Sequence, residues 1–243
     1  MNKKAIFLGG TKGLGLSLAK KAAHLGMKPI ILGSSAQEEE VSKDFPDDNE
    51  AYTVDLCNMN DVDGAAYGTG SIDYLFWISG VFLKKPLNEV SDFEIRRMTD
   101  IHFLGPVTYL RNFLKVQTTP FHLITIASCS SWRLRKNESL YTGLKAAQAC
   151  FSRNLAEDIA EQLPGSKSLL INPGGLNTPN FWKNENIDTA GFLNPDKVAD
   201  IIWDHVLNQK TVFQEVQILR KKPVVIGSDP IIKYGPQKPE IPT

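Results

Sequence analysis

Short apolar runs alternate regularly with longer amphipathic stretches along most of the chain. Apolar runs of strand length between turn residues are typical of buried parallel strands, and the amphipathic stretches are typical of the helices that connect such strands. This alternation predicts an α/β fold, a Rossmann-type doubly wound parallel sheet of about seven strands with helices on both faces, in a three-layer sandwich. The predicted strands are residues 5–9, 29–33, 51–54, 72–79, 121–127, 168–173 and 222–227.

Length and composition predict one domain. The 243 residues contain no linker, no repeat and no low-complexity stretch, and they suffice for one substantial core, so we expect a single domain over residues 1–243. Residues 175–194 are rich in glycine, asparagine and proline, and we expect a substrate loop there. The tail at residues 229–243 contains several prolines, and we expect it to drape over the surface or to be disordered.

Charge, the amino terminus and the cysteines exclude several classes of partner. Basic and acidic residues number 27 each, which disfavours nucleic acid and anionic membrane surfaces. Glycine interrupts the first apolar run almost at once, so we expect neither a signal peptide nor a membrane span, and a cytoplasmic location follows. The three cysteines are odd in number and lack metal-site spacing, so we expect no disulfide framework and no metal site.

A glycine-rich turn joins the first predicted strand to the first predicted helix. Glycines allow the backbone to turn tightly and to approach a pyrophosphate, which the free N–H groups of the helix start bind. Three glycines also occur in ordinary turns, but the position between a strand and a helix favours nucleotide binding. The predicted cofactor contacts in this turn are Gly9, Thr11, Lys12, Gly13, Leu14 and Gly15.

The end of the second predicted strand indicates which nicotinamide cofactor is bound. A cofactor without a 2′-phosphate prefers a carboxylate there to accept from the ribose hydroxyl, and Gly33, Ser34 and Ser35 offer none. Lys12 can pair with a 2′-phosphate, helped by the two serine hydroxyls, or it can be a solvated loop lysine. We therefore expect NADP(H) in preference to NAD(H).

Asp55 and Leu56 follow the third predicted strand. A carboxylate at a strand's carboxyl end can accept from the adenine amino group or can cap the next helix, and the spacing does not separate these two roles. Asp55, with its neighbour Leu56, is therefore a candidate contact for the adenine of the cofactor.

A hydroxyl, a phenol and an ammonium group lie between residues 128 and 145. Tyr141 and Lys145 are four residues apart, so in a helix they share one face, and a neighbouring ammonium lowers the pKa of a phenol and makes it a usable proton donor. Ser128 lies at the end of a predicted strand, where open α/β sheets bind ligands. The alternative is that Tyr141 and Lys145 belong to an ordinary exposed helix start.

Residues 91–115 are predicted to form a long helix. Ser91 or Asp92 suits the amino-terminal cap, with Glu94 completing a capping box. Gly105-Pro106 predicts a kink or local break within the helix. His102 lies one turn before that break, and a lone helical histidine is either a structural group or a catalytic one.

Together these features resemble the short-chain dehydrogenase/reductase family over residues 4–227. The glycine-rich turn resembles the family's T-G-x-x-x-G-x-G turn, with Leu8 where threonine is usual. Ser128, Tyr141 and Lys145 match the serine and the Y-x-x-x-K positions of the family, and Asp55 matches its adenine-contacting aspartate. Asn172-Pro173-Gly174 and Thr178 resemble the segment that touches the nicotinamide carboxamide.

The resemblance implies a mechanism and a set of site residues. A hydride would pass between nicotinamide and a carbonyl or alcohol carbon, while Ser128 holds the oxygen and Tyr141 exchanges its proton. Lys145 would lower the pKa of Tyr141 and bind the nicotinamide ribose. The resemblance adds His102 to the catalytic residues and adds to the cofactor contacts Gly80, Pro173, Gly174 and Thr178, beside Tyr141 and Lys145.

Two departures from the family pattern support an alternative function. Residues 77–80 read Trp-Ile-Ser-Gly where Asn-Asn-Ala-Gly is usual, and His102 stands where an asparagine usually holds a water of the proton relay. We expect an NADP(H)-dependent oxidoreductase acting on a small carbonyl or alcohol, and the alternative is a weak or inactive NADP(H)-binding sensor.

The aromatic residues and the family relatives predict the kind of substrate and the assembly. Trp132, Phe181, Trp182 and Phe192 favour a small apolar or aromatic ketone as substrate. The resemblance implies a homodimer or homotetramer assembled through the helices at 91–115 and 141–163.

Overall fold

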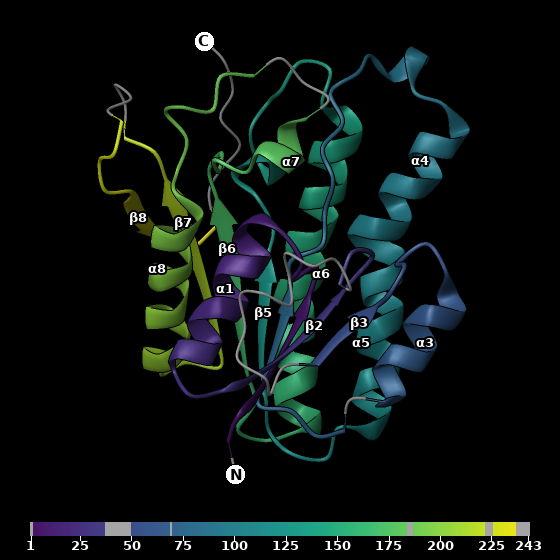
Figure 1. Ribbon diagram of the computed structural model, residues 1–243, viewed down its shortest axis with the longest axis vertical. Coiled ribbons are helices and arrows are strands. Elements are labelled where there is room, and N and C mark those ends of the chain that lie inside the picture. Colours follow the sequence, from purple (N-terminus) through teal and green to yellow (C-terminus); the bar gives the residue numbers. More distant parts are fainter. Residues whose placement is uncertain (1, 37–49, 69, 184–186, 222–225, 237–243) are drawn as a thin grey trace.

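The computed structural model describes residues 2–36, 50–68, 70–183, 187–221 and 226–236. Within these residues an eight-stranded sheet has the order β3-β2-β1-β4-β5-β6-β7-β8 (Figure 1). Strands β1 to β7 are parallel, and β8 is antiparallel to β7. The strands are β1 Lys4–Leu8, β2 Lys28–Gly33, β3 Glu50–Thr53, β4 Tyr74–Trp77, β5 His122–Ile126, β6 Lys167–Pro173, β7 Phe213–Leu219 and β8 Ile231–Tyr234.

Helices cover both faces of the sheet, which confirms the predicted three-layer, doubly wound α/β fold (Figure 1). One core contains buried residues of α1 and α8, and the core on the opposite face contains residues of α3, α5 and α6. The helices are α1 Gly13–His24, α3 Met59–Gly68, α4 Asp92–Thr99, α5 Gly105–Val116, α6 Ser139–Gln162, α7 Pro179–Trp182 and α8 Pro195–Asn208, with shorter turns η1 Leu87–Glu89, η2 Asp100–Leu104 and η3 Cys129–Ser131.

The strands in the C-terminal part of the chain differ from the prediction. Two strands that the sequence pattern did not indicate, β7 and β8, bring the described total to eight instead of about seven. The predicted strand at 222–227 lies mostly outside the described residues, and its described end, 226–227, is a turn. The tail predicted to drape or to be disordered contains β8, which pairs with β7 over residues 231–234. The tail prediction was therefore wrong for this segment, because unpaired backbone groups at the edge of β7 accept a further strand.

The centre of the sheet accommodates the unusual residues 77–80 at the end of β4 and directly after it. Trp77 is fully buried and makes an edge-to-face contact with Phe151, at 6.1 Å between ring centroids. The Ser79 hydroxyl donates to the Ile101 carbonyl at 3.0 Å, and the Ser79 amide donates to the Leu8 carbonyl. The two Ser79 contacts connect the segment after β4 to β1 and to η2.

The long predicted helix is divided in two by a π-helical turn. Ser91 caps α4 and forms the predicted capping box with Glu94. The interruption is η2, a π-helix that ends directly before Gly105-Pro106 and contains His102. A π-turn commonly marks a functional position in a helix, and here it contains His102, whose Nε2 contacts Val81 in the segment after β4.

Candidate active site

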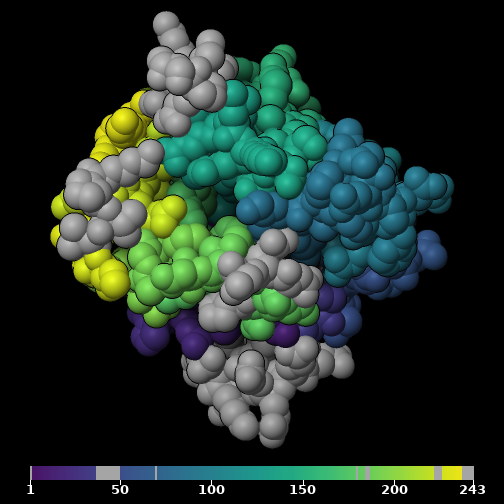
Figure 2. Space-filling model, turned by 90° about the horizontal axis from the view of Figure 1, so that it is seen from above, coloured from purple at the N-terminus to yellow at the C-terminus, as the bar shows by residue number. Residues whose placement is uncertain are grey.

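A cleft of about 1280 Å³ opens at the carboxyl ends of the parallel strands. Figure 2 views the molecule from this side, where segments far apart in the sequence converge. The strand order reverses between β1 and β4, and this is the position at which open α/β sheets bind ligands. All the predicted site residues except His102 line the cleft.

The glycine-rich turn forms the floor of one half of the cleft. A Cβ on Gly15 would lie 2.1 Å from the Gly9 carbonyl oxygen, and a Cβ on Gly9 would lie 2.7 Å from the Ser79 amide nitrogen. Gly13 faces Thr178, whose Cγ2 would be 2.8 Å from an added Cβ. The turn therefore packs backbone against backbone, and its shape suits a ligand that must approach the peptide groups closely, such as a pyrophosphate.

The residues predicted to select the cofactor lie near this turn. Lys12 is the cap residue of α1, and Ser34 follows β2. The Ser35 hydroxyl donates to the Thr11 hydroxyl at 3.1 Å, which joins the two turns. Asp55 is exposed at the cleft wall and accepts from the Cys57 amide at 2.9 Å, so its carboxylate already orders the turn after β3.

Ser128, Tyr141 and Lys145 all line the cleft and are all buried. Tyr141 and Lys145 lie in α6, four residues apart on one face, as predicted. Ser128 follows β5 and caps η3, where its hydroxyl accepts from the Ser130 amide at 3.0 Å. The structure thus brings the hydroxyl, the phenol and the amine to one wall.

The ionisation of this group differs from the expectation that Lys145 lowers the pKa of Tyr141. Burial raises the pKa of Tyr141, and a hydrogen bond with the Ser128 hydroxyl opposes that rise. Burial lowers the pKa of Lys145 to about 7. Its Nζ donates to the Ile126 carbonyl at 3.1 Å and to Gln148 Oε1 at 2.8 Å. Removal from water therefore dominates both pKa values in this structure.

His102 lies behind the cleft wall. It is fully buried, and its Nε2 lies 2.7 Å from the Val81 carbonyl oxygen. Its Nδ1 has no hydrogen-bond partner among the described residues. Burial, together with the Lys145 charge, lowers the pKa of His102 to about 3, so the ring is neutral. A Cβ on Gly80 would lie 3.0 Å from the His102 ring and 3.4 Å from the Lys145 Nζ. Gly80 therefore packs closely against both side chains, and it lines the cleft whereas His102 does not.

The end of β6 and the segment after it also line the cleft, with Pro173, Gly174 and Thr178. This segment continues into α7, where Trp182 Nε1 donates to the Leu176 carbonyl at 2.8 Å. Phe181, Trp182 and Phe192 line the cleft as the composition suggested, whereas Trp132 is not among its lining residues.

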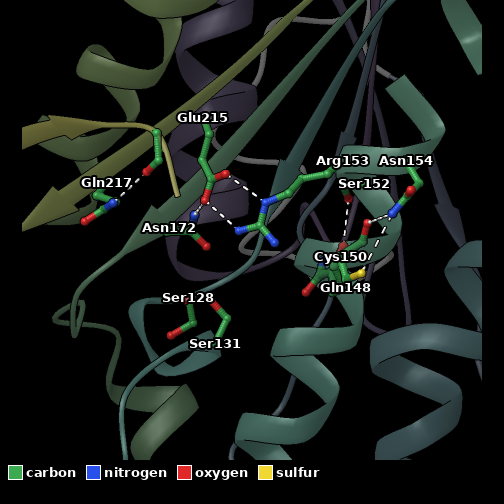
Figure 3. A network of polar contacts seen from close by, with 11 residues as sticks. Ser128, Ser131, Gln148, Cys150, Ser152, Arg153, Asn154, Asn172, Glu215 and Gln217 are labelled. Carbon is green, nitrogen blue, oxygen red and sulfur yellow. Dashed lines mark hydrogen bonds and ion pairs between the residues drawn. The ribbon is translucent and has the colours of Figure 1, made fainter. Parts of the chain in front are cut away.

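A buried ion pair supports this segment from below. Arg153 of α6 donates to both carboxylate oxygens of Glu215 in β7, each at 2.9 Å, and the Asn172 amide donates to the same carboxylate at 2.8 Å. Figure 3 shows both donors reaching Glu215. Asn172 directly precedes Pro173, so this network connects α6, β6 and β7 beneath the cleft.

The sequence analysis missed Phe82 and Gln148. The Phe82 ring lies 5.0 Å from the Tyr141 ring and 4.7 Å from the Trp182 ring, between centroids. Gln148 is fully buried and accepts from Lys145. Gln148 is three residues after Lys145 on the same helix face, so helical spacing was a usable signal. Phe82 follows β4 in an irregular segment and offered none.

Two absences hold for the described part of the chain. It contains no helix that is both long and apolar enough to cross a membrane. The same residues include no group of three or more histidine, cysteine, aspartate or glutamate side chains arranged to hold a metal ion.

Known proteins are similar to this chain in sequence and in structure. The family model described as short chain dehydrogenase matches residues 3–188. An uncharacterized oxidoreductase of Staphylococcus saprophyticus is 27% identical over 189 residues, which cover 73% of this chain and 80% of that protein. One of Staphylococcus haemolyticus is 26% identical over 212 residues, covering 82% and 88%.

Two solved structures have the same fold. A short chain dehydrogenase/reductase family protein has a TM-score of 0.78 at 20% identity, covering 88% of this chain and 94% of that one. An alcohol dehydrogenase from the archaeon Thermococcus sibiricus, complexed with 5-hydroxy-NADP, has a TM-score of 0.77 at 19% identity, covering 90% and 96%. The match of the family model over most of the chain, together with the cleft and its residues, leads to one conclusion: this protein belongs to the short-chain dehydrogenase/reductase family of oxidoreductases.

Proposed function

We propose that this protein is an NADPH-dependent carbonyl reductase acting on small apolar or aromatic ketones. The observation that carries the proposal is that Ser128, Tyr141 and Lys145 line the same cleft as the glycine-rich turn. In the reaction, the carbonyl carbon receives a hydride and the carbonyl oxygen receives a proton, which yields an alcohol. A bound nicotinamide supplies the hydride.

The residues of the chain would hold and protonate the substrate. The Ser128 hydroxyl donates a hydrogen bond to the carbonyl oxygen, and the Tyr141 phenol gives that oxygen its proton as negative charge develops there. Lys145, held by Gln148 and Ile126, carries a mobile proton close to neutrality because burial lowers its pKa to about 7. His102 contacts Val81 and faces Lys145 through Gly80, so it acts as a positioning residue.

The remaining site residues would bind the cofactor. The turn from Gly9 to Gly15 would bind the pyrophosphate, Asp55 and Leu56 the adenine, and Pro173, Gly174 and Thr178 the nicotinamide carboxamide; all of these residues line the cleft. Lys12 and Ser34 support NADP(H) over NAD(H), since Lys12 offers a cation in the glycine-rich turn and Ser34 a hydroxyl after β2, and both line the cleft. A similar alcohol dehydrogenase was solved with 5-hydroxy-NADP and another similar protein, BdcA, with NADPH.

A homodimer or homotetramer is part of the proposal. Large apolar side chains are exposed along the helix that runs from α4 into η2: Phe93 is 72% exposed and Leu104 is 47% exposed. Exposed apolar residues gathered on one element favour a contact with a second copy.

The alternative is an NADP(H)-binding sensor with little or no turnover. Two observations favour it: burial raises the pKa of Tyr141, and the Lys145 amine donates to Gln148 and Ile126. A sensor has no need of a proton donor, however, and the cleft retains the phenol beside the Ser128 hydroxyl.

The decisive experiment measures NADPH oxidation with a panel of aromatic ketones, diketones and aldehydes. We expect turnover by the wild type and a loss of about 10²-fold or more in kcat for Tyr141→Phe, which should still bind NADPH.

The cofactor preference is tested separately. The kcat/KM with NADPH should exceed that with NADH by about tenfold, and Lys12→Met should reduce this ratio. The control Lys210→Met, which replaces an exposed lysine outside the cleft, should leave the ratio unchanged. Binding of NADPH without turnover across the panel would favour the sensor, and a preference for NADH would overturn the cofactor assignment.

A further inference from the structure

The cleft contains basic side chains beyond Ser128 that the proposed chemistry does not use. Arg135, Lys183 and Arg220 line the cleft, and its acidic lining residues are Asp55, Asp100 and Glu138. Burial is the main cause of the raised pKa of Tyr141, and the charge of Glu138 adds to it. Basic residues outnumber acidic ones in the lining of the cleft, although the chain as a whole has balanced charge.

Arg220 is held in the wall of the cleft. It directly follows β7, and its guanidinium stacks on the Phe192 ring at 4.4 Å from the centroid. Its side chain reaches the neighbourhood of Cys129, the residue after Ser128, because Cys129 is among the groups that act on its charge. The cation thus lies beside the wall that carries the predicted catalytic hydroxyl.

The charge on Arg220 is poorly compensated by the protein. Burial is the largest effect on this guanidinium and lowers its pKa, and the positive charges of Arg135 and Arg133 lower it further. Among the described residues, no carboxylate forms an ion pair with Arg220 or with Arg135. Arg133 directs one nitrogen toward the Cys129 sulfur, at 3.4 Å.

This arrangement favours the binding of an anion. A guanidinium that is partly withdrawn from water next to like charges loses solvation free energy. A bound carboxylate offsets that loss, because it accepts two parallel, charge-assisted hydrogen bonds from the guanidinium. The stacking on Phe192 holds the planar fork in one orientation, so little side-chain freedom is lost when a carboxylate binds.

We propose that the physiological substrate carries a carboxylate, and that Arg220, assisted by Arg135, is the specificity-determining residue that binds it. The inference rests on the proposed function. Phe82 and Trp182 contact the apolar part of the substrate while the reacting carbonyl lies at Ser128. The substrate class is therefore that of apolar or aromatic oxo acids, which are reduced to hydroxy acids.

The test compares acids with neutral molecules of nearly the same shape. The probes are the ortho, meta and para acetylbenzoates and their methyl esters, assayed with NADPH on the full chain. For the best-fitting isomer we expect kcat/KM of the acid to exceed that of its ester by about tenfold or more, since one good charge-assisted pair is worth about that factor. Arg220→Met, which keeps an apolar stem against Phe192, should lower the value for the acid by about 10- to 100-fold, mainly through KM, and leave the ester unchanged.

Matched variants separate charge from folding. Arg220→Lys should retain part of the preference for the acid, because it keeps the charge but loses the planar fork. Arg135→Met, at an exposed position, should weaken the preference by a smaller factor. Lys210→Met should change kcat/KM for neither the acid nor the ester. Equal losses for acid and ester in Arg220→Met would mean that the arginine is structural, and the inference would be overturned.

Calorimetric titration of acid and ester into the protein with NADP+ makes the result independent of turnover. If the protein reduces the esters but no acid exceeds its ester in kcat/KM or in affinity, the inference is overturned and the proposed function is retained. Tighter binding of the acid that depends on Arg220, with no reduction of any probe, supports the inference about the ligand and contradicts the proposed function. If no acid is favoured over its ester in either measurement, the inference fails.

Discussion

Replacement of Arg153 by methionine should destabilise the protein, because it leaves the Glu215 carboxylate buried without its cation. The Glu215 side chain is 1% exposed, the Arg153 side chain is 36% exposed, and two hydrogen bonds of 2.9 Å join them (Figure 3). Removal of one partner of a buried pair costs about 3–5 kcal/mol. We expect the lower end, about 3 kcal/mol, because Arg153 is partly hydrated and because Asn172 still donates to the carboxylate.

Equilibrium denaturation in urea measures this loss directly. At about 2–4 °C per kcal/mol for a chain of this size, the melting temperature should fall by about 6–12 °C. Arg111→Met, at an exposed arginine of α5, is the matched control and should stay within about 0.5 kcal/mol of the wild type. The double variant Arg153→Met, Glu215→Gln should recover much of the stability, because no buried charge remains and the glutamine oxygen can still accept from the Asn172 amide.

The reasoning would be refuted by either of two results. A loss below about 1 kcal/mol for Arg153→Met would mean that water or another donor compensates Glu215. A double variant no more stable than the single one would mean that Arg153 acts through packing and not through the charge of Glu215.

Three further predictions concern the turn and two buried bases. Gly15→Ala should abolish NADPH binding in a calorimetric titration, because its Cβ would lie 2.1 Å from a carbonyl oxygen, whereas Gly64→Ala, in open space on α3, should bind normally. Burial lowers the pKa of Lys145 to about 7 from its ordinary 10.5, so unfolding takes up a proton between these values and wild-type stability rises with pH across them. Lys145→Met should therefore be more stable than the wild type at pH 7, by a margin that shrinks toward pH 10.5; a margin independent of pH would contradict this. Burial lowers the pKa of His102 to about 3 from 6.5, so wild-type stability falls as pH drops between these values, and His102→Asn should unfold at lower pH in an acid titration.

Features that depend on neighbours in the chain were predictable from the sequence. Strand and helix periodicity indicated the α/β fold, and helical spacing put Tyr141 and Lys145 on one face. The glycine-rich turn was recognisable because the position of Gly9 and Gly15 between a strand and a helix limits what such a turn can do. The roles of these residues stay predictions until the variants are assayed.

Features that depend on distant partners were not predictable. Strand β7 reads Phe-Gln-Glu-Val-Gln-Ile-Leu, with buried polar residues that obscure its apolar pattern. Glu215 is tolerated there because Arg153, 62 residues away, and Asn172, 43 residues away, donate to it. Such a partner cannot be identified from the spacing within one strand.

The ionisation of Tyr141 and Lys145 likewise depends partly on neighbours in the sequence and partly on the whole fold. The four-residue spacing of Tyr141 and Lys145 correctly predicted their common helix, but the inference that the ammonium would lower the pKa of the phenol considered only that neighbour. In the folded chain both side chains are buried, and loss of hydration is the largest effect on both pKa values. The sequence by itself determined which groups can meet, through short-range geometry. Only the tertiary structure decided how dry and how charged their surroundings are, because burial is a property of the whole packed chain.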